Sequence, residues 1–128
     1  MASILVIDDD APIRLLLKEA LSRDGHVVRV AVDGIDGVRL FRTHSADLII
    51  TDLVMPEQDG LATIMELRRI EPQLPIIAMS GGMVQNPKLY LQLAEKLGAN
   101  RVLQKPFVLQ DLLATVADVL ASPRPPAT

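Results

Sequence analysis

Cysteine and tryptophan are absent from this chain of 128 residues, and its only aromatic residues are Phe41, Tyr90 and Phe107. Without cysteine the chain can form neither a disulfide framework nor a thiolate metal site, which favours a reducing compartment. Basic residues are also few: 13 Lys and Arg stand against 16 Asp and Glu, and the formal net charge is −3. Proteins that bind nucleic acid normally carry a basic patch or base-stacking aromatics, so we expect no direct contact with nucleic acid.

Long apolar runs are missing as well. None approaches the roughly 20 residues that span a membrane, and the N-terminus lacks the basic region and long apolar core of a signal peptide. These absences predict a cytoplasmic protein that does not enter a membrane. Hydrophobic residues make up 49% of the chain, which is enough for the core of one domain. We expect this domain to cover residues 1–121 and a flexible, proline-rich tail to cover 122–128.

Short apolar segments rich in β-branched residues predict five strands. They are Ser3–Ile7, His26–Ala31, Asp47–Asp52, Pro75–Met79 and Arg101–Gln104. Apolar residues at helical spacing predict a helix after each strand. These helices run from the N-cap Asp10 to Gly25, from Ile35 to His44, from the N-cap Asp59 to Ile70, from Pro87 to Leu97 and from Leu109 to Ala121. The first should bury Ile13, Leu16, Leu17, Ala20 and Leu21, and the fourth Tyr90, Leu93, Ala94 and Leu97.

Alternating strands and amphipathic helices predict an α/β fold, with a parallel sheet covered by helices on both faces. Right-handed crossovers then lead to a doubly wound three-layer sandwich in the flavodoxin-like strand order 2-1-3-4-5. In this order the first and third strands are neighbours. Because the carboxyl ends of parallel strands meet at one edge of a sheet, we expect Asp8 and Asp9, after the first strand, to lie close to Asp52 at the end of the third.

Three carboxylates this close repel one another, and a bound cation relieves the repulsion. Oxygen ligands without His or Cys select a hard ion, so we expect Mg²⁺, with Mn²⁺ as an alternative. The formal charges of Asp8, Asp9, Asp52 and Lys105 sum to −2, which a divalent ion neutralises. A carboxylate could then attack a phosphoryl group, while Lys105 and the Ser80 hydroxyl contact its oxygens.

Each of these residues has a simpler explanation when it is considered alone. An Asp-Asp-Asp run after a strand is usually a solvated turn with a helix cap, and an acid such as Asp52 is more often a cap or turn residue. Lys105 by itself suggests a surface lysine, and Ser80-Gly81-Gly82 a turn. Their joint occurrence favours a functional site, because acids, a hydroxyl and a lysine follow four different strands at one predicted edge of the sheet.

At these residues the chain resembles the response-regulator receiver domains of two-component signalling, over roughly Ile4 to Leu120. The matching pieces are Ile4-Leu5-Val6-Ile7-Asp8-Asp9-Asp10, Asp52-Leu53-Val54-Met55-Pro56 with Asp59-Gly60, Ser80-Gly81 and Lys105-Pro106-Phe107. The resemblance implies that Asp52 is the phosphoacceptor and that Asp8, Asp9, Asp52 and the Val54 carbonyl bind Mg²⁺. It also implies that Ser80 is the switch hydroxyl, and that Lys105 contacts the phosphoryl group and precedes a cis proline bond.

Two departures from the family pattern concern the output switch. Val102 stands three positions before Lys105, where the family usually has Tyr or Phe, and the chain between Ser80 and Lys105 is a few residues longer around Gly82 to Pro87. We therefore expect the switch to involve Ser80, Val102, Gly81 and Gly82. If this segment switches, we expect the downstream protein partner to bind the fourth helix, fifth strand and fifth helix.

The main hypothesis is a stand-alone signalling module that catalyses only its own phosphorylation and dephosphorylation. Its phosphoryl donor would be a sensor histidine kinase or a histidine phosphotransfer protein. One alternative is a haloacid-dehalogenase-like phosphohydrolase with Asp8 as nucleophile, since Asp8 and Asp10 imitate its Asp-x-Asp motif; Pro12 stands where that motif has Thr or Val. A flavodoxin is a second alternative, but acids replace its Ser- and Thr-rich phosphate loop and would repel phosphate.

Overall fold

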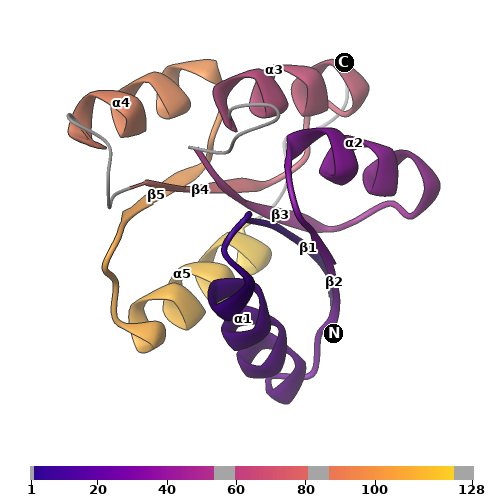
Figure 1. Ribbon diagram of the computed structural model, residues 1–128, viewed down its shortest axis with the longest axis vertical. Coiled ribbons are helices and arrows are strands. Elements are labelled where there is room, and N and C mark those ends of the chain that lie inside the picture. Colours follow the sequence, from indigo (N-terminus) through magenta and orange to yellow (C-terminus); the bar gives the residue numbers. More distant parts are fainter. Residues whose placement is uncertain (1, 54–59, 81–86, 123–128) are drawn as a thin grey trace.

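The computed structural model describes residues 2–53, 60–80 and 87–122. Five strands alternate with five helices in this part of the chain (Figure 1). Their bounds are β1 Ser3–Ile7, α1 Ala11–Arg23, β2 Val27–Ala31, α2 Gly34–Thr43, β3 Leu48–Asp52, α3 Gly60–Ile70, β4 Ile76–Ser80, α4 Pro87–Leu97, β5 Arg101–Gln104 and α5 Leu109–Ala121. Within the described ranges, every helix is too short or too polar to span a membrane.

All strands are parallel and form one sheet in the order β2-β1-β3-β4-β5, which confirms the predicted topology. Ile7 pairs with Thr51, Asp52 with Met79, and Ser80 with Gln104. This register brings the last residues of β1, β3, β4 and β5 to one edge of the sheet. The residues that follow the strands at this carboxyl edge are therefore neighbours in space, although they are far apart in sequence.

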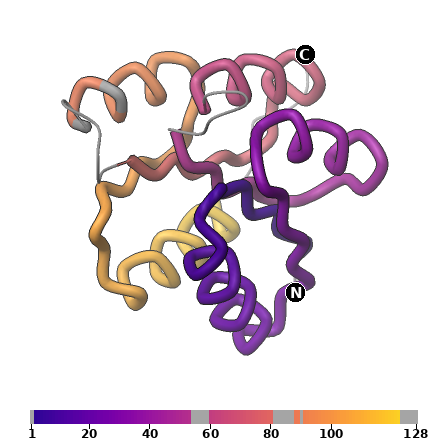
Figure 2. The backbone as a smooth tube through the Cα atoms, in the orientation of Figure 1, coloured from indigo at the N-terminus to yellow at the C-terminus, as the bar shows by residue number. Residues whose placement is uncertain are grey.

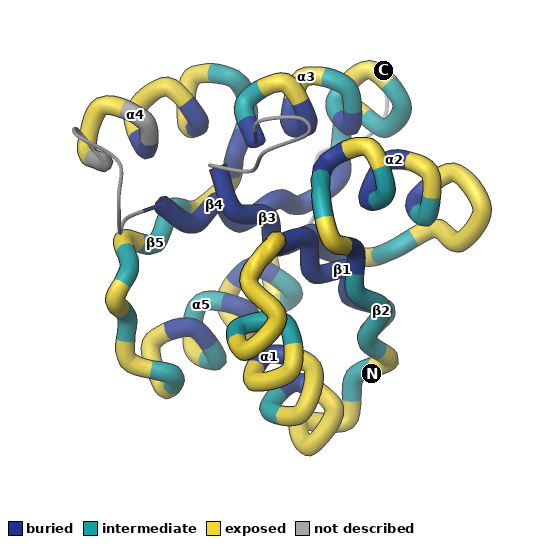
Figure 3. Tube along the Cα trace, in the orientation of Figure 1, coloured by how far each residue is buried: buried dark blue, intermediate teal, exposed yellow. Residues whose placement is uncertain are grey.

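Helices cover both faces of the sheet. Helices α2, α3 and α4 lie on one face, and α1 and α5 lie on the other (Figures 1 and 2). The strands supply the middle of both cores because successive side chains point to opposite faces. Leu5 and Ile7 of β1 join the core under α2 and α3, whereas Ile4 and Val6 join the core under α1 and α5. Figure 3 shows the central strands as the most buried part of the molecule.

Two helices bury a narrower stripe than the sequence pattern predicts. On α1, Leu17 and Leu21 are fully buried, but Leu16 is 44% exposed. On α4, Leu91 and Ala94 are buried, and the prediction for Leu93 is wrong because its exposed fraction is 39%. Apolar residues occupy several faces of α4, so their spacing alone could not decide which of them meets the sheet. The side chain of Tyr90 lies outside the described residues.

Candidate functional site

Asp8 directly follows β1 at the carboxyl edge and is completely buried. Its N–H donates to the Ala31 carbonyl at 3.2 Å, and its carbonyl accepts from Arg14 Nη1 at 2.8 Å. Its carboxylate accepts from the Asp10 N–H through Oδ1 at 2.9 Å and from Lys105 Nζ through Oδ2 at 3.0 Å. Every polar group of Asp8 therefore has a partner. Asp10 is the N-cap residue of α1, as predicted, although its side chain makes no capping hydrogen bond.

Asp52 is the last residue of β3 and is 7% exposed. Its Oδ1 accepts the Leu53 N–H at 2.9 Å, and its Oδ2 lies 3.5 Å from Lys105 Nζ. The first residue of α3 packs against its backbone, since a Cβ on Gly60 would lie 2.3 Å from the Asp52 carbonyl oxygen. The Gly60 N–H also donates to the Leu53 carbonyl at 2.8 Å. Glycine at position 60 thus allows α3 to begin directly beside Asp52.

The three predicted acids come together as expected. Asp8, Asp9 and Asp52 each offer a carboxylate oxygen, and these oxygens lie within 4.8 Å of one another. Asp8 and Asp52 are buried, and Asp9 is exposed to solvent. A group of three carboxylates without nitrogen or sulfur ligands suits a small, hard divalent cation. The donor set of the site therefore fits the predicted metal ion.

The site concentrates negative charge away from water. Burial, followed by the negative charge of Asp8, raises the pKa of Asp52 to about 6. Burial also raises the pKa of Asp8, against the lowering effect of the Asp10 N–H and Lys105. Burial alone would lower the pKa of Lys105, but the charges of Asp52 and Asp8 outweigh it and raise this pKa. Lys105 therefore remains a cation between two carboxylates that repel each other.

Ser80 ends β4 at the same edge and is fully buried. Among the described residues, its Oγ is the buried side-chain oxygen without a hydrogen-bond partner. A buried hydroxyl without a partner costs free energy, commonly about 1–3 kcal/mol, so such atoms usually have a functional explanation. A ligand oxygen bound at the carboxyl edge could accept a hydrogen bond from the Ser80 hydroxyl.

The remaining predicted residues are only partly described. Val54, Gly81 and Gly82 lie outside the described residues, so the roles predicted for them stay predictions. Val102 is half-buried in β5, pairs with Ala78 and packs against the core under α2, α3 and α4. The Lys105–Pro106 peptide bond is cis, as the resemblance implied.

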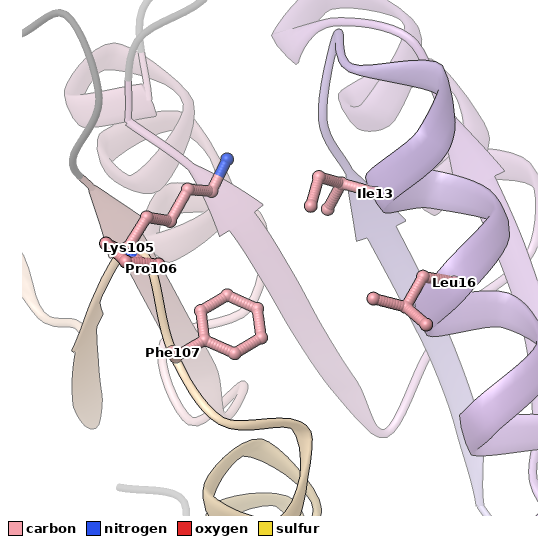
Figure 4. Close-up of a pocket in the computed structure, with 5 residues that line it drawn as sticks. All are labelled: Ile13, Leu16, Lys105, Pro106 and Phe107. Atoms are coloured by element: carbon pink, nitrogen blue, oxygen red, sulfur yellow. The ribbon is translucent and has the colours of Figure 1, made fainter.

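An apolar pocket of about 340 Å³ adjoins the site (Figure 4). Ile13 and Leu16 of α1 form one wall, and Pro106 and Phe107, after β5, form the other together with Lys105. The lysine thus belongs both to the acid cluster and to this pocket. Leu16 lines this pocket and does not join the core, which accounts for its exposure.

Comparison with known proteins identifies the family. The family model described as "Response regulator receiver domain" matches residues 4–117. The chain belongs to this family. Receiver domains are the phosphoacceptor domains of two-component systems, and this chain is one of them. The comparisons give no support to a haloacid-dehalogenase-like hydrolase.

Relatives are similar to the receiver domain over nearly its whole length. The DNA-binding transcriptional regulator NtrC of Azospirillum brasilense is 43% identical over 126 residues, which are 98% of this chain and 26% of that protein. A response regulator receiver domain protein from Clostridium thermocellum has a TM-score of 0.85 and 34% identity, with 94% of each chain covered. The receiver domain of NtrX from Brucella abortus has a TM-score of 0.86 and 30% identity, with 94% of this chain and 99% of that chain covered. The chain thus spans about a quarter of the length of this NtrC relative.

Sequence reasoning missed one residue at the site. Arg14 reaches back from α1 to the Asp8 carbonyl, yet nothing in the predicted helix distinguished it from Lys18 or Arg23. Its position one turn after Asp10 is the only available signal. A side chain at that position can return to the strand end from which its helix starts.

Proposed function

We propose that Asp52 accepts a phosphoryl group from a phosphohistidine and that this modification changes the binding of a downstream protein. The observation that carries the proposal is the position of Lys105 Nζ, 3.0 Å from Asp8 and 3.5 Å from Asp52, within a cluster of three carboxylates. This arrangement supports the proposal, because it would surround one point with a nucleophile, a cation and metal ligands. The unpartnered Ser80 hydroxyl at the same edge supports it.

The transfer is a displacement at phosphorus. Because Asp52 Oδ1 accepts the Leu53 N–H, we expect Oδ2 to attack. A new P–O bond forms, the P–N bond to the donor imidazole breaks, and the imidazole nitrogen keeps the electron pair. Lys105 Nζ and the Ser80 hydroxyl then donate hydrogen bonds to the phosphoryl oxygens, which carry the transferred negative charge. The product is an acyl phosphate on Asp52.

Asp8, Asp9 and Asp52 would hold Mg²⁺, or Mn²⁺, together with the Val54 carbonyl predicted from the resemblance. When bound, the ion neutralises charge on the transferring phosphoryl group. Asp8 is oriented for this role by the Asp10 N–H and Lys105, which occupy fixed positions on its two oxygens. Asp9 is exposed and contributes its carboxylate from the solvent side.

Acetyl phosphate with Mg²⁺ tests this assignment. We expect the wild-type domain to gain one base-labile phosphoryl group, measured by intact-protein mass, and Asp52→Asn to gain none. Asp10→Asn is the matched control, because it removes an acid from the same edge whose side chain makes no capping hydrogen bond; it should label close to the wild-type rate. Labelling of Asp52→Asn at the wild-type rate would refute the proposal.

We further propose that the phosphohistidine protein, a sensor histidine kinase or a histidine phosphotransfer protein, contacts the pocket beside Lys105. A donor imidazole must approach Asp52 past the same lysine, and exposed apolar surface is what protein partners bury. Leu16→Ala should slow labelling by a protein donor but not by acetyl phosphate. Leu15→Ala, also exposed on α1 but lining a different pocket, should slow neither. Equal effects of Leu16→Ala with both donors would contradict this contact.

For the output, we propose a protein partner on α4, β5 and α5, with the switch through Ser80, Val102, Gly81 and Gly82. Exposed Leu89 and Leu93 on α4 support this surface. Amide exchange with and without beryllofluoride tests it: protection should change most in residues 81–92, and Ser80→Ala should reduce the change. A uniform change over the domain would count against the switch.

The remaining parts of the proposed role follow from this chemistry. We propose that the domain acts in the cytoplasm and catalyses only its own phosphorylation and dephosphorylation. Incubating the domain with small phosphomonoesters should release no phosphate, and turnover of any of them would contradict a purely self-directed activity.

A further inference from the structure

Arg14 of α1 contacts the backbone of the segment Asp8-Asp9-Asp10, which we call the acid turn. Its Nη1 donates to the Asp8 carbonyl at 2.8 Å, and its own N–H donates to the Asp10 carbonyl at 3.0 Å as part of the first turn of α1. Arg14 is half-buried, and it lines a surface pocket together with Val30 of β2. Arg14 thus holds one carbonyl of the acid turn with its side chain and another with its backbone.

The Asp8 carbonyl belongs to the peptide unit that joins Asp8 to Asp9. The Asp8 side chain is already held by Asp10 and Lys105, but Asp9 is exposed, so its direction depends on the backbone that carries it. A hydrogen bond on the Asp8 carbonyl restricts rotation of this peptide unit. The hydrogen bond from Arg14 therefore acts on the peptide unit that leads into Asp9.

We propose that Arg14 is a positioning residue for the divalent cation, acting through the Asp8 carbonyl to hold Asp9 in its binding direction. This inference rests on the proposed function, in which Asp8, Asp9 and Asp52 bind the ion. Residues that do not touch the metal but orient its ligands by hydrogen bonds commonly contribute about 10-fold or more to metal affinity. Arg14 does so although its own charge repels the ion.

An electrostatic role and a positioning role of Arg14 predict opposite changes in Mg²⁺ affinity when Arg14 is replaced. A guanidinium near the acids repels a divalent cation, so an electrostatic role alone predicts tighter Mg²⁺ binding when Arg14 is removed. A positioning role predicts weaker binding, because Asp9 is no longer held. The sign of the change in affinity therefore separates the two roles without any measurement of phosphorylation.

Titration calorimetry of the unphosphorylated domain with MgCl₂ tests the proposal. Arg14→Met keeps the side-chain stem and removes the guanidinium, and it should weaken Mg²⁺ binding by about 10-fold. Lys18→Met is the matched control: Lys18 is a cation one turn further along α1, and it lines the same surface pocket as Arg14. It should bind Mg²⁺ as tightly as the wild type, or more tightly.

Arg14→Lys provides the second variant, because it restores a positive charge and one N–H donor. It should recover part of the lost affinity, and thermal unfolding without Mg²⁺ should show that all variants are folded. Wild-type affinity in Arg14→Met, or no recovery in Arg14→Lys, would overturn the positioning role alone. Failure of the wild-type domain to bind Mg²⁺ would overturn the proposed metal site itself.

Discussion

At the carboxyl edge of the sheet, Asp8, Asp52 and Lys105 are charged groups that face one another, whereas at the amino edge the guanidinium of Arg68 faces neutral oxygens. Arg68, near the end of α3, donates to the carbonyl of Gly98 from Nε at 3.1 Å and to the side chain of Asn100 from Nη2 at 2.9 Å. It also donates to the carbonyls of Pro72, at 3.3 Å, and Leu74. These acceptors lie at the end of α4 and just before β4 and β5.

The surroundings of Arg68 suit a structural role. Burial lowers the pKa of Arg68 and the negative charge of Glu71 raises it, but a guanidinium keeps its proton. The groups that accept its hydrogen bonds are neutral. Asn100 extends the network, since its Oδ1 also accepts the Ile76 N–H at 2.9 Å. Gly98 permits the close approach: its φ is +121°, and a Cβ there would lie 2.6 Å from Arg68 Nε. One side chain thus joins α3, α4, β4 and β5.

The carboxyl edge is arranged in the opposite way. Its acids repel one another, Asp52 has a raised pKa, and the Ser80 hydroxyl lacks a partner. Such a site lowers stability until an ion or a phosphoryl group supplies the missing interactions, a common compromise where function needs polar groups in the interior. The difference teaches that burial of charge stabilises this fold only where the partners are already present.

The largest expected effect concerns the amino edge. Arg68→Ala should lower the free energy of unfolding by about 2–4 kcal/mol, because the carbonyls of Gly98, Pro72 and Leu74 lose a charged donor. Urea denaturation measures the change. Arg69→Ala is the control, since this neighbouring side chain is exposed, and it should change stability by no more than about 0.5 kcal/mol. Equal effects of the two substitutions would contradict the structural role of Arg68.

Removing a charge at the carboxyl edge should raise the free energy of unfolding instead of lowering it. Without metal at pH 7, Asp52→Asn should stabilise the domain by about 1–3 kcal/mol, because it removes the buried carboxylate. The sign follows from linkage: the pKa of Asp52 is raised from 3.8 to about 6, so the folded state binds its proton more tightly than the unfolded state. Wild-type stability therefore falls as pH rises through this interval and then stays reduced.

Denaturation of both proteins at several pH values measures this effect. The advantage of Asp52→Asn should be full above pH 6 and should shrink toward pH 4, where the wild-type carboxyl is protonated in the folded state. An advantage that does not change with pH would show that the gain does not come from the charge of Asp52.

A smaller effect should follow from adding the cation. Mg²⁺ at ten times its Kd should stabilise the wild-type domain by about 1.4 kcal/mol, since binding to the folded state alone adds this amount. Thermal unfolding with and without MgCl₂ measures the shift. Asp9→Ala should lose most of it, because one of the three carboxylates is missing. An undiminished shift in Asp9→Ala would remove Asp9 from the proposed ligands.

The smallest effect should come from a charge pair whose side chains are exposed to solvent. Arg101 of β5 and Asp118 of α5 form a salt bridge with N and O atoms 2.6 Å apart, but their side chains are 47% and 63% exposed. A double-mutant cycle with Arg101→Ala and Asp118→Ala should give a coupling of about 0.5 kcal/mol or less, because water screens exposed pairs. A coupling as large as the Arg68 effect would show that burial and neutral partners do not explain the strength of the Arg68 interactions.

Much of the fold was predictable because its signals are local. The bounds predicted for β1, α4, β5 and α5 agree with the structure, since turn residues and apolar periodicity mark the ends of these elements. The packing of individual helix faces was less predictable. Leu16 was expected in the core but lines the pocket beside Lys105, and Leu91 replaces Leu93 in the core under α4.

The sequence by itself determined the order of strands and helices and the acid, hydroxyl or lysine that stands at the end of β1, β3, β4 and β5. These properties depend on residues that are near one another in the chain. Only the tertiary structure decided that Lys105 lies between Asp8 and Asp52, that Arg14 returns to the Asp8 carbonyl, and that Arg68 rather than Arg69 is buried among carbonyls. Lys105 and Asp8 are 97 positions apart, and chemically equivalent arginines differ only in what the packed elements place around them.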